Sequence, residues 1–342
     1  MIDFDRFLRE HVEITNDTGG RGYDSGVRTF SCPFCGDEKN RGWLGIEKMG
    51  AGCFNIGCVA EPTLEGGAVE WARRILRLGS RGEAYRLLIE RYGTESTFVT
   101  PAKDLSIDDW CRLPASAHSF TCSSPHPLAP LQREFENFIG VQWGLSIEDA
   151  QRWDLRWCLS GRYAWRVIIP IVMGGRIVAF QARTIRDAEP KYITSRHGAP
   201  DDPLAECGRP AARLLFNADA LRKGLPAVIV EGVGDVMGWA KDARHDPAVG
   251  LLGVALTPAK ESILLDAEPG FLTVALDAEV EAQARARAHA DRLRTIGLRA
   301  APGEWVGGKD AGSGARLGLI THRDIGVRLG DQIRARRRLP TK

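Results

Sequence analysis

Short apolar runs alternate with segments of helical periodicity in the second half of the chain. The apolar runs cover residues 227–230, 249–255, 271–276 and 298–301, and helical patterns lie between them. Short apolar runs bounded by Gly, Pro or charged residues are typical of strands that are buried on both faces. Since such strands alternate here with helices, the sequence predicts an α/β unit with a doubly wound parallel sheet.

Acidic residues follow three of the extended segments in this region. Glu231 comes directly after the first run, Asp277 and Glu279 follow the third, and Asp310 lies after a further short stretch; Asp235 is one helical turn beyond Glu231. Ligand chemistry in an open α/β sheet gathers outside the carboxyl ends of the strands, and carboxylates placed there suit Mg²⁺ and, through it, phosphates. We therefore expect metal-dependent work on phosphate esters; the alternative is that these acids cap helices or face solvent.

Four of the eight cysteines form the pattern C-x2-C-x17-C-x4-C, with Cys32 and Cys35 as the first pair and Cys53 and Cys58 as the second. Two tight pairs, separated by enough chain for a small hairpin, let four thiolates converge on one tetrahedral ion. The pattern predicts structural Zn²⁺, and the alternative is four reduced thiols that happen to cluster. Because four protein ligands leave no open coordination position, this zinc would stabilise a fold and take no part in catalysis.

A basic and aromatic segment precedes the acidic α/β region. Residues 152–196 carry nine basic and three acidic side chains, a net charge of +6, whereas the whole chain has a net charge of only +2. Basic groups that track a backbone, interleaved with aromatic faces for unpaired bases, are typical of a single-strand groove. The alternative is that the aromatic rings lie in a core and that the arginines are solvated on strand edges.

Composition and length set the remaining expectations. The chain has 342 residues, with 44% hydrophobic and 26% charged residues, as in an ordinary globular protein of two or three domains. No apolar run reaches the roughly 18 to 20 residues of a membrane span, and acids stand at the N-terminus where a signal peptide carries positive charge. We therefore expect a cytoplasmic protein with no membrane partner.

Changes in composition along the chain predict five segments. They are a zinc-binding unit with helices over 1–95, a linker over 96–130, a basic subdomain over 131–225, the acidic α/β unit over 226–315 and a C-terminal tail over 316–342.

The acidic motifs resemble those of a Toprim domain. These motifs are Glu231-Gly232 with Asp235, then Asp277-Ala278-Glu279, then Gly308-Lys309-Asp310. Upstream, residues 166–171, 179–183 and 190–195 resemble the basic N-terminal part of the polymerase core of bacterial-type (DnaG-like) primases. The four-cysteine unit is similar to the zinc-binding domain of primases, in the form found in phage-type members. The resemblance covers nearly the whole chain in the expected order.

The resemblance implies a DNA primase, which makes short RNA primers on a single-stranded DNA template from ribonucleoside triphosphates. Glu231, Asp277 and Glu279 would hold Mg²⁺ or Mn²⁺, with Asp235 and Asp310 assisting. The residues that would bind nucleotide or nucleic acid are Arg166, Arg183, Lys191, Tyr192 and Lys309. A separate replicative helicase would be a further partner.

Two departures from the family pattern leave the number of metals open. Glu279 stands where the family usually has Asp, and Gly312 stands where the third motif commonly has a second acid. Two other classes of function also stay open: a Toprim-type nuclease that uses the same acids, and a non-catalytic replication factor that binds single-stranded DNA.

Overall fold

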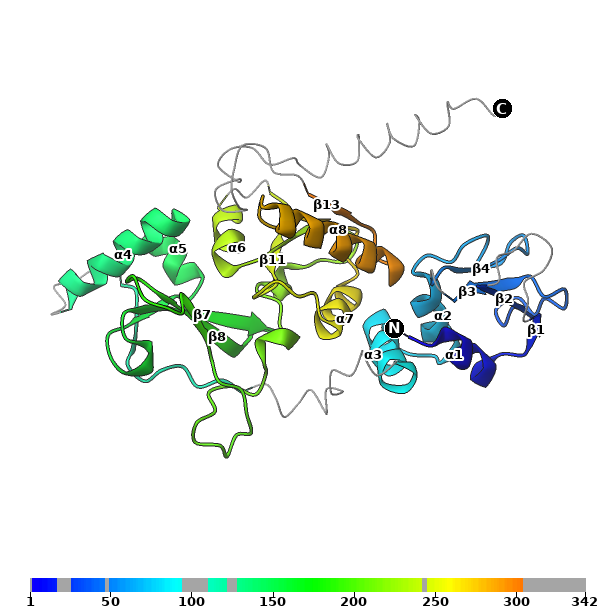
Figure 1. Cartoon of the computed structure of the whole chain (residues 1–342), viewed down its shortest axis with the longest axis horizontal. Helices are drawn as coiled ribbons and strands as arrows, with labels where there is room; N and C mark the ends of the chain where they lie inside the picture. The colour runs from blue at the N-terminus through cyan, green and yellow to red at the C-terminus, as the bar shows by residue number, and fades with distance from the viewer. Residues whose placement is uncertain are drawn as a thin grey trace, which may run out of the picture.

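Three structural units follow one another across the molecule, with a parallel sheet in the middle (Figure 1). The computed structural model describes residues 2–16, 26–46, 49–93, 110–121, 128–241 and 245–303. An antiparallel sheet lies on one side of the parallel sheet, and a small unit with four cysteines lies on the other. The expected mixed α/β fold is thus confirmed. Within the described ranges, no helix is both long and apolar enough to cross a membrane.

The central sheet has four parallel strands in the order β11-β10-β12-β13. Its strands are β10 (Pro226–Val230), β11 (Ala248–Gly250), β12 (Phe271–Val274) and β13 (Ala300–Pro302). Its helices are α6 (Val233–Trp239), α7 (Pro258–Ala267) and α8 (Val280–Thr295). The second strand is shorter than the apolar run that predicted it, because Leu252 and Gly253 take positive φ angles of 57° and 138° and turn the chain.

Helices cover both faces of this sheet, as expected for a doubly wound unit. Ala227 and Ile229 of β10 belong to the core that contains α7 and α8. Val228 and Val230, which point to the opposite face, belong to the core that contains α6. Since side chains alternate along a strand, the unbroken apolar run of β10 reflects burial on both faces.

The antiparallel sheet has five strands in the order β5-β6-β7-β8-β9. Its strands are β5 (Ala117–Ser119), β6 (Arg156–Cys158), β7 (Arg166–Met173), β8 (Arg176–Thr184) and β9 (Tyr192–Thr194). Strands β7 and β8 form a hairpin, and the carboxylate of Asp219 accepts hydrogen bonds of 2.8 and 2.9 Å from the amides of Gly174 and Gly175 at its turn. The short 3-10 helices are η2 (Gly161–Tyr163), η3 (Ala211–Arg213) and η4 (Ala218–Ala220).

Two helices pack on the antiparallel sheet, α4 (Ala129–Trp143) and α5 (Ile147–Arg152). A capping box starts α5: the Ser146 hydroxyl accepts a hydrogen bond from the amide of Asp149, and the Asp149 carboxylate accepts one from the amide of Ser146.

Part of the segment expected to be a linker belongs to this sheet. Strand β5 pairs with β6, and Phe120 is 2% exposed in the core beneath it. The sequence did not indicate this strand because three residues at a sheet edge are too few for a visible alternation of apolar and polar side chains.

The N-terminal unit contains a four-stranded antiparallel sheet in the order β1-β2-β3-β4. Its strands are β1 (Ile14–Asn16), β2 (Val27–Phe30), β3 (Gly42–Gly45) and β4 (Ala51–Cys53), and its helices are α1 (Phe4–His11), α2 (Gly67–Ile75) and α3 (Arg81–Tyr92). The buried residues of this unit form one continuous core with α7, α8 and one face of the parallel sheet.

A buried polar contact accompanies this shared core. The phenol of Tyr85 on α3, which is fully buried, donates a hydrogen bond to Glu261 on α7 and accepts one from Arg292 on α8. Arg292 also donates to Glu261 over 2.7 Å. Burial and the nearby Glu261 charge raise the pKa of Tyr85, so the phenol stays protonated and donates a hydrogen bond to the carboxylate.

Glycines allow the two units to approach closely at this contact. A Cβ atom at Gly82 on α3 would collide with the carboxylate of Asp266 on α7. A Cβ atom at Gly297, where φ is +91°, would collide with the backbone of Gly66. The zinc unit therefore approaches the parallel-sheet unit at two points where a glycine has no side chain, Gly82 against α7 and Gly297 against Gly66.

We predict that Gly82→Ala lowers the free energy of unfolding by roughly 1–3 kcal/mol, because the added methyl group overpacks the contact with Asp266. Gly140 in α4 is the matched control, since a Cβ there meets only the Leu145 carbonyl at 3.8 Å. Gly140→Ala should raise the stability by roughly 0.5–1 kcal/mol through helix propensity. Urea titration followed by circular dichroism measures both. Destabilisation of the same size in both variants would contradict the packing account.

Candidate functional site

The connections of the central sheet create a switch point between β10 and β12. From β10 the chain passes through α6 to β11 on one side, whereas from β12 it passes through α8 to β13 on the other. Helix α6 packs in the core on one face of the sheet, and α8 packs in the core on the opposite face. Crevices at the carboxyl ends of strands form at such switch points and bind ligands.

Glu231 and Asp277 lie at this switch point. Glu231 directly follows β10, and the hydrogen bond of 2.8 Å from the Ala275 amide to the Ile229 carbonyl continues the pairing of the two strands beyond β12. Glu231 is therefore in register with Leu276, one residue before Asp277. The structure thus places the two expected ligands at the ends of adjacent strands.

An arginine that the sequence analysis did not single out neutralises Glu231. Arg285 on α8 places its Nη2 atom 3.2 Å from Glu231 Oε1, and the two side chains are 36% and 22% exposed. The Nε atom of Arg285 is buried and has no hydrogen-bond partner within the described residues. Only the packing of α8 against the sheet brings this arginine, 54 residues further along the chain, to the acid.

The other expected acids have different surroundings. Asp235 accepts a hydrogen bond of 3.0 Å from the Gly232 amide and so caps α6. Glu279 is exposed at the N-cap of α8. Gln283 donates to the carbonyls of Leu276 and Asp277 over 3.2 and 2.9 Å, which fixes the loop between β12 and α8.

The acids do not form a closed metal site in the part of the chain that the structure describes. There, the four cysteines are the only group of three or more Cys, His, Asp or Glu residues whose ligand atoms lie together. Asp310 and Lys309 lie outside the described residues. The structure therefore brings Glu231 and Asp277 to one edge and does not gather Asp235 and Glu279 into a cluster with them.

A basic and aromatic surface meets α6 beside this edge. The Arg183 guanidinium on β8 lies 5.0 Å from the centre of the Tyr192 ring and 5.8 Å from that of Phe138. Its Nη1 atom is buried without a hydrogen-bond partner within the described residues. Burial raises the pKa of Tyr192 to about 12, and the charge of Asp235 on α6 contributes to the rise. Arg183 and Tyr192, both expected to bind nucleic acid, thus lie against one another, and the charge of Asp235 acts on Tyr192.

Trp143, at the end of α4, completes this contact. Its indole lies against Gly234 of α6, where a Cβ atom would collide with the indole nitrogen. Gly234 therefore allows α4 to approach α6. The G-V-G-D sequence after Glu231 is the signal that could have indicated this close contact.

Arg166 and Lys191, both expected to bind nucleic acid, lie in different surroundings. Arg166 is 6% exposed and its Nη1 donates to the carbonyls of Ala182 and Lys191 over 3.3 and 3.1 Å. This placement argues against the expected phosphate contact, because the guanidinium is committed to holding β9 on the sheet. Lys191, which directly precedes β9, is exposed.

The four cysteines of the N-terminal unit converge as expected. Their sulfur atoms all lie within 4.8 Å of one another; Cys32 and Cys58 are 3.8 Å apart, and Cys35 and Cys53 are 3.9 Å apart. Four thiolates at the Zn–S distance of about 2.3 Å would be separated by about 3.8 Å in a tetrahedron. The donor set and its spacing fit a structural zinc ion.

Hydrogen-bond donors near these sulfurs favour the thiolate form, whereas burial raises the net pKa of Cys32 and of Cys53. Asn55 donates to Cys35 through Nδ2 over 3.5 Å and to Cys53 through its amide over 3.4 Å, and the Ala60 amide donates to Cys58 over 3.4 Å. The Asn55 hydrogen bond lowers the pKa of Cys35 to about 7. Such groups around the ligands orient them and support metal binding.

We predict that Cys35→Ser abolishes binding of one zinc ion per chain and unfolds the four-stranded N-terminal sheet, because binding of a structural metal is coupled to folding. Cys111→Ser removes a thiol outside the cluster and should keep the metal. Atomic absorption of the purified variants gives the zinc content, and limited proteolysis reports the fold. Full zinc content in Cys35→Ser would exclude this residue as a ligand.

No family model matches the chain, but parts of its sequence are similar to known proteins. A DNA primase of Halalkalibacterium halodurans is 37% identical over 119 residues, which cover 33% of this chain and 18% of that protein. A DNA primase of Synechococcus elongatus is 38% identical over 108 residues, 30% of this chain and 14% of that protein. A DNA primase of Neisseria meningitidis is 28% identical over 140 residues, 41% of this chain and 22% of that protein. The matched segments thus span only a minor part of these relatives.

Solved structures of primase domains are similar at lower identity. The zinc-binding and RNA polymerase domains of the Aquifex aeolicus primase match 96% of this chain and 82% of that chain, at 18% identity and a TM-score of 0.44. A DnaG primase catalytic domain bound to single-stranded DNA matches 62% of this chain and 74% of that chain, at 19% identity and a TM-score of 0.45.

The sequence matches to DNA primases from three bacteria confirm the resemblance that the ordered motifs indicated: over about a third of its length, this chain is similar to bacterial DNA primases of the DnaG-like type.

Proposed function

We propose that this protein is a DNA primase, a nucleotidyltransferase that makes short RNA primers on single-stranded DNA during replication. The observation that supports it most is the position of Arg183 and Tyr192 beside α6. This helix carries Asp235 and follows Glu231, which lies at the carboxyl edge of the central sheet, here called the acidic edge. A cationic and aromatic surface for a strand thus borders carboxylates suited to a metal and a triphosphate. Sequence similarity to bacterial DNA primases supports the same function.

In this proposal, Glu231, Asp277 and Glu279 hold Mg²⁺ or Mn²⁺ at the carboxyl edge of the central sheet, with Asp235 and Asp310 assisting. Bound there, such an ion would supply charge neutralisation for the triphosphate. Arg183 and the exposed Lys191 bind phosphates, and the Tyr192 ring stacks on a base. Gln283 orients the ligand loop through the Leu276 and Asp277 carbonyls.

The proposed function gives each of the five predicted segments a role. The first unit, 1–95, would be a zinc-binding domain that helps to choose the start site on the template. Residues 131–225 would form the basic subdomain of a polymerase core, and residues 226–315 a Toprim domain. Segments 96–130 and 316–342 would be a linker and a tail, although residues 110–121 pack with the basic subdomain. Ribonucleoside triphosphates and a separate replicative helicase stay predicted partners.

A single assay separates the three classes of function. The full chain is incubated with single-stranded DNA, labelled ribonucleotides and Mg²⁺ or Mn²⁺. Labelled oligoribonucleotides of defined length would support the primase. Shortened DNA would instead indicate a nuclease, and DNA retention without either product would indicate a binding factor.

We predict that Glu231→Gln lowers primer synthesis by at least about a hundredfold, because the amide removes a charged ligand from the proposed metal site. Affinity for single-stranded DNA and thermal stability should stay close to those of the wild type. Glu90→Gln, at an exposed position of α3, is the control and should retain activity. Normal synthesis by Glu231→Gln would refute the metal assignment.

We further predict that Arg285→Gln tightens Mn²⁺ binding about fivefold, because Glu231 then loses the partly exposed cation that competes with the metal. Electron paramagnetic resonance of free Mn²⁺ measures this affinity without any need for activity. Arg287→Gln removes an exposed charge from the same helix and controls for net charge. Equal affinities in the two variants would show that Arg285 does not compete for Glu231.

A further inference from the structure

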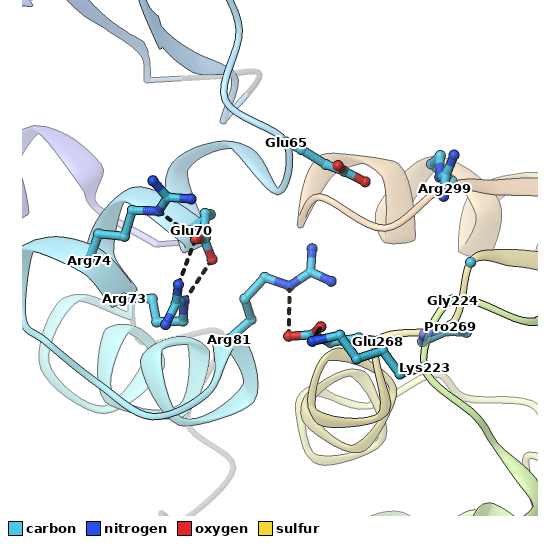
Figure 2. Close-up of a pocket in the computed structure, with 11 residues that line it drawn as sticks. Glu65, Glu70, Arg73, Arg74, Arg81, Lys223, Gly224, Glu268, Pro269 and Arg299 are labelled. Carbon is cyan, nitrogen blue, oxygen red and sulfur yellow. Dashed lines mark hydrogen bonds and ion pairs between the residues drawn. The ribbon is translucent and has the colours of Figure 1, made fainter. Parts of the chain in front are cut away.

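A polar cavity of about 380 Å³ lies between the zinc unit and the parallel-sheet unit (Figure 2). From the zinc unit, α2 and the start of α3 line it; from the sheet unit, the segments that lead into β10, β12 and β13 line it. In Figure 2, Arg81 extends from α3 into the space between the units, and Glu65 and Arg299 lie across from it. The cavity is separate from the acidic edge, because its sheet-side segments precede the strands whereas the acids follow them.

Cations outnumber anions in this cavity. Its lining contains five Arg or Lys side chains and three Glu side chains, which gives a net charge of +2. Two of the acids are already committed. Glu70, which is 7% exposed, accepts hydrogen bonds from Arg73 and Arg74, and Glu268 pairs with Lys223 over 2.6 Å and with Arg81 over 3.9 Å.

Basic groups in the lining retain unused donors. The Arg299 guanidinium makes no hydrogen bond or ion pair with any described residue. Arg74 uses Nε for Glu70 and rests its guanidinium over the Phe34 ring at 5.8 Å, and Arg81 has only a long ion pair and one bond to the Gly297 carbonyl. A guanidinium carries five N–H donors, so most of the donors of Arg299 and Arg81 are available to a ligand.

The chemistry of the lining selects the class of ligand. Polar surface exceeds apolar surface in the lining, and most of the lining side chains are charged, so charge dominates binding. Guanidinium groups match the oxygens of phosphate in bidentate geometry, and the volume suits a ligand of nucleotide size. We propose that this cavity is a second anion site, which binds the phosphate groups of a nucleotide or of a nucleic-acid strand at the seam between the two units.

Such a ligand would bridge the two units. Arg81 comes from the zinc unit and Arg299 from the sheet unit, whose backbones already touch at Gly66 and Gly297. A phosphate between the two guanidinium groups would offset their repulsion and add a contact across the seam. Because a ligand stabilises the state that binds it, phosphate should raise the melting temperature of the docked form.

The test uses the full chain and inorganic pyrophosphate in a buffer without divalent cations, so that the proposed metal-dependent edge is not engaged. Isothermal titration calorimetry should show binding that weakens about fivefold in Arg299→Gln, the loss of one charge-assisted contact at an exposed site. Glu65→Gln should tighten binding by a similar factor, since it removes the third acid of the lining. Arg133→Gln, at an exposed position of α4, should bind like the wild type.

Two competition arms distinguish the sources of phosphate. Displacement of pyrophosphate by metal-free ATP alone would identify a nucleotide as the ligand, and displacement by a short single-stranded oligonucleotide would identify a strand backbone. Absence of binding, or equal affinities in wild type, Arg299→Gln and Glu65→Gln, would overturn the proposal. Glu231→Gln changes the proposed metal site and not the cavity, so it should bind pyrophosphate like the wild type. Pyrophosphate binding thus tests the cavity separately from the primase proposal.

Discussion

Burial of strand β10 on both faces is the constraint on which the other units depend. Ala227 and Ile229 point into the core shared with the zinc unit, and Val228 and Val230 point into the core shared with the antiparallel sheet. One strand of five residues thus connects the two main cores. Since its position also fixes where Glu231 emerges, the same packing that holds the molecule together sets the location of the acidic edge.

Contacts between the units depend on glycines, which have no side chain, as well as on buried side chains. Gly82 admits Asp266, Gly297 admits the Gly66 backbone, and Gly234 admits the Trp143 indole. The buried Tyr85 phenol then adds a hydrogen bond to each member of the Arg292–Glu261 ion pair, whose carboxylate is buried. The zinc unit and the basic surface are therefore both placed by close packing against the central unit.

Charge compensation differs between the two polar regions of the molecule. At the sheet edge, one arginine from α8 offsets Glu231, and its guanidinium is partly buried. In the cavity at the seam, cations exceed acids, and two of the three acids are already paired. At the sheet edge, a metal ion can thus replace the arginine as the partner of Glu231, whereas the cavity at the seam can bind an anion.

Local patterns in the sequence determined the elements and the ligands that are close in the chain. Apolar runs predicted the strands of the central sheet, and cysteine spacing predicted the four-thiol cluster. Only the tertiary structure decided which distant residues meet: Arg285 with Glu231, Trp143 with Gly234, and Arg166 with two carbonyls inside the sheet. The reason is physical, because period and spacing act over a few residues, whereas these contacts depend on how whole helices and sheets pack.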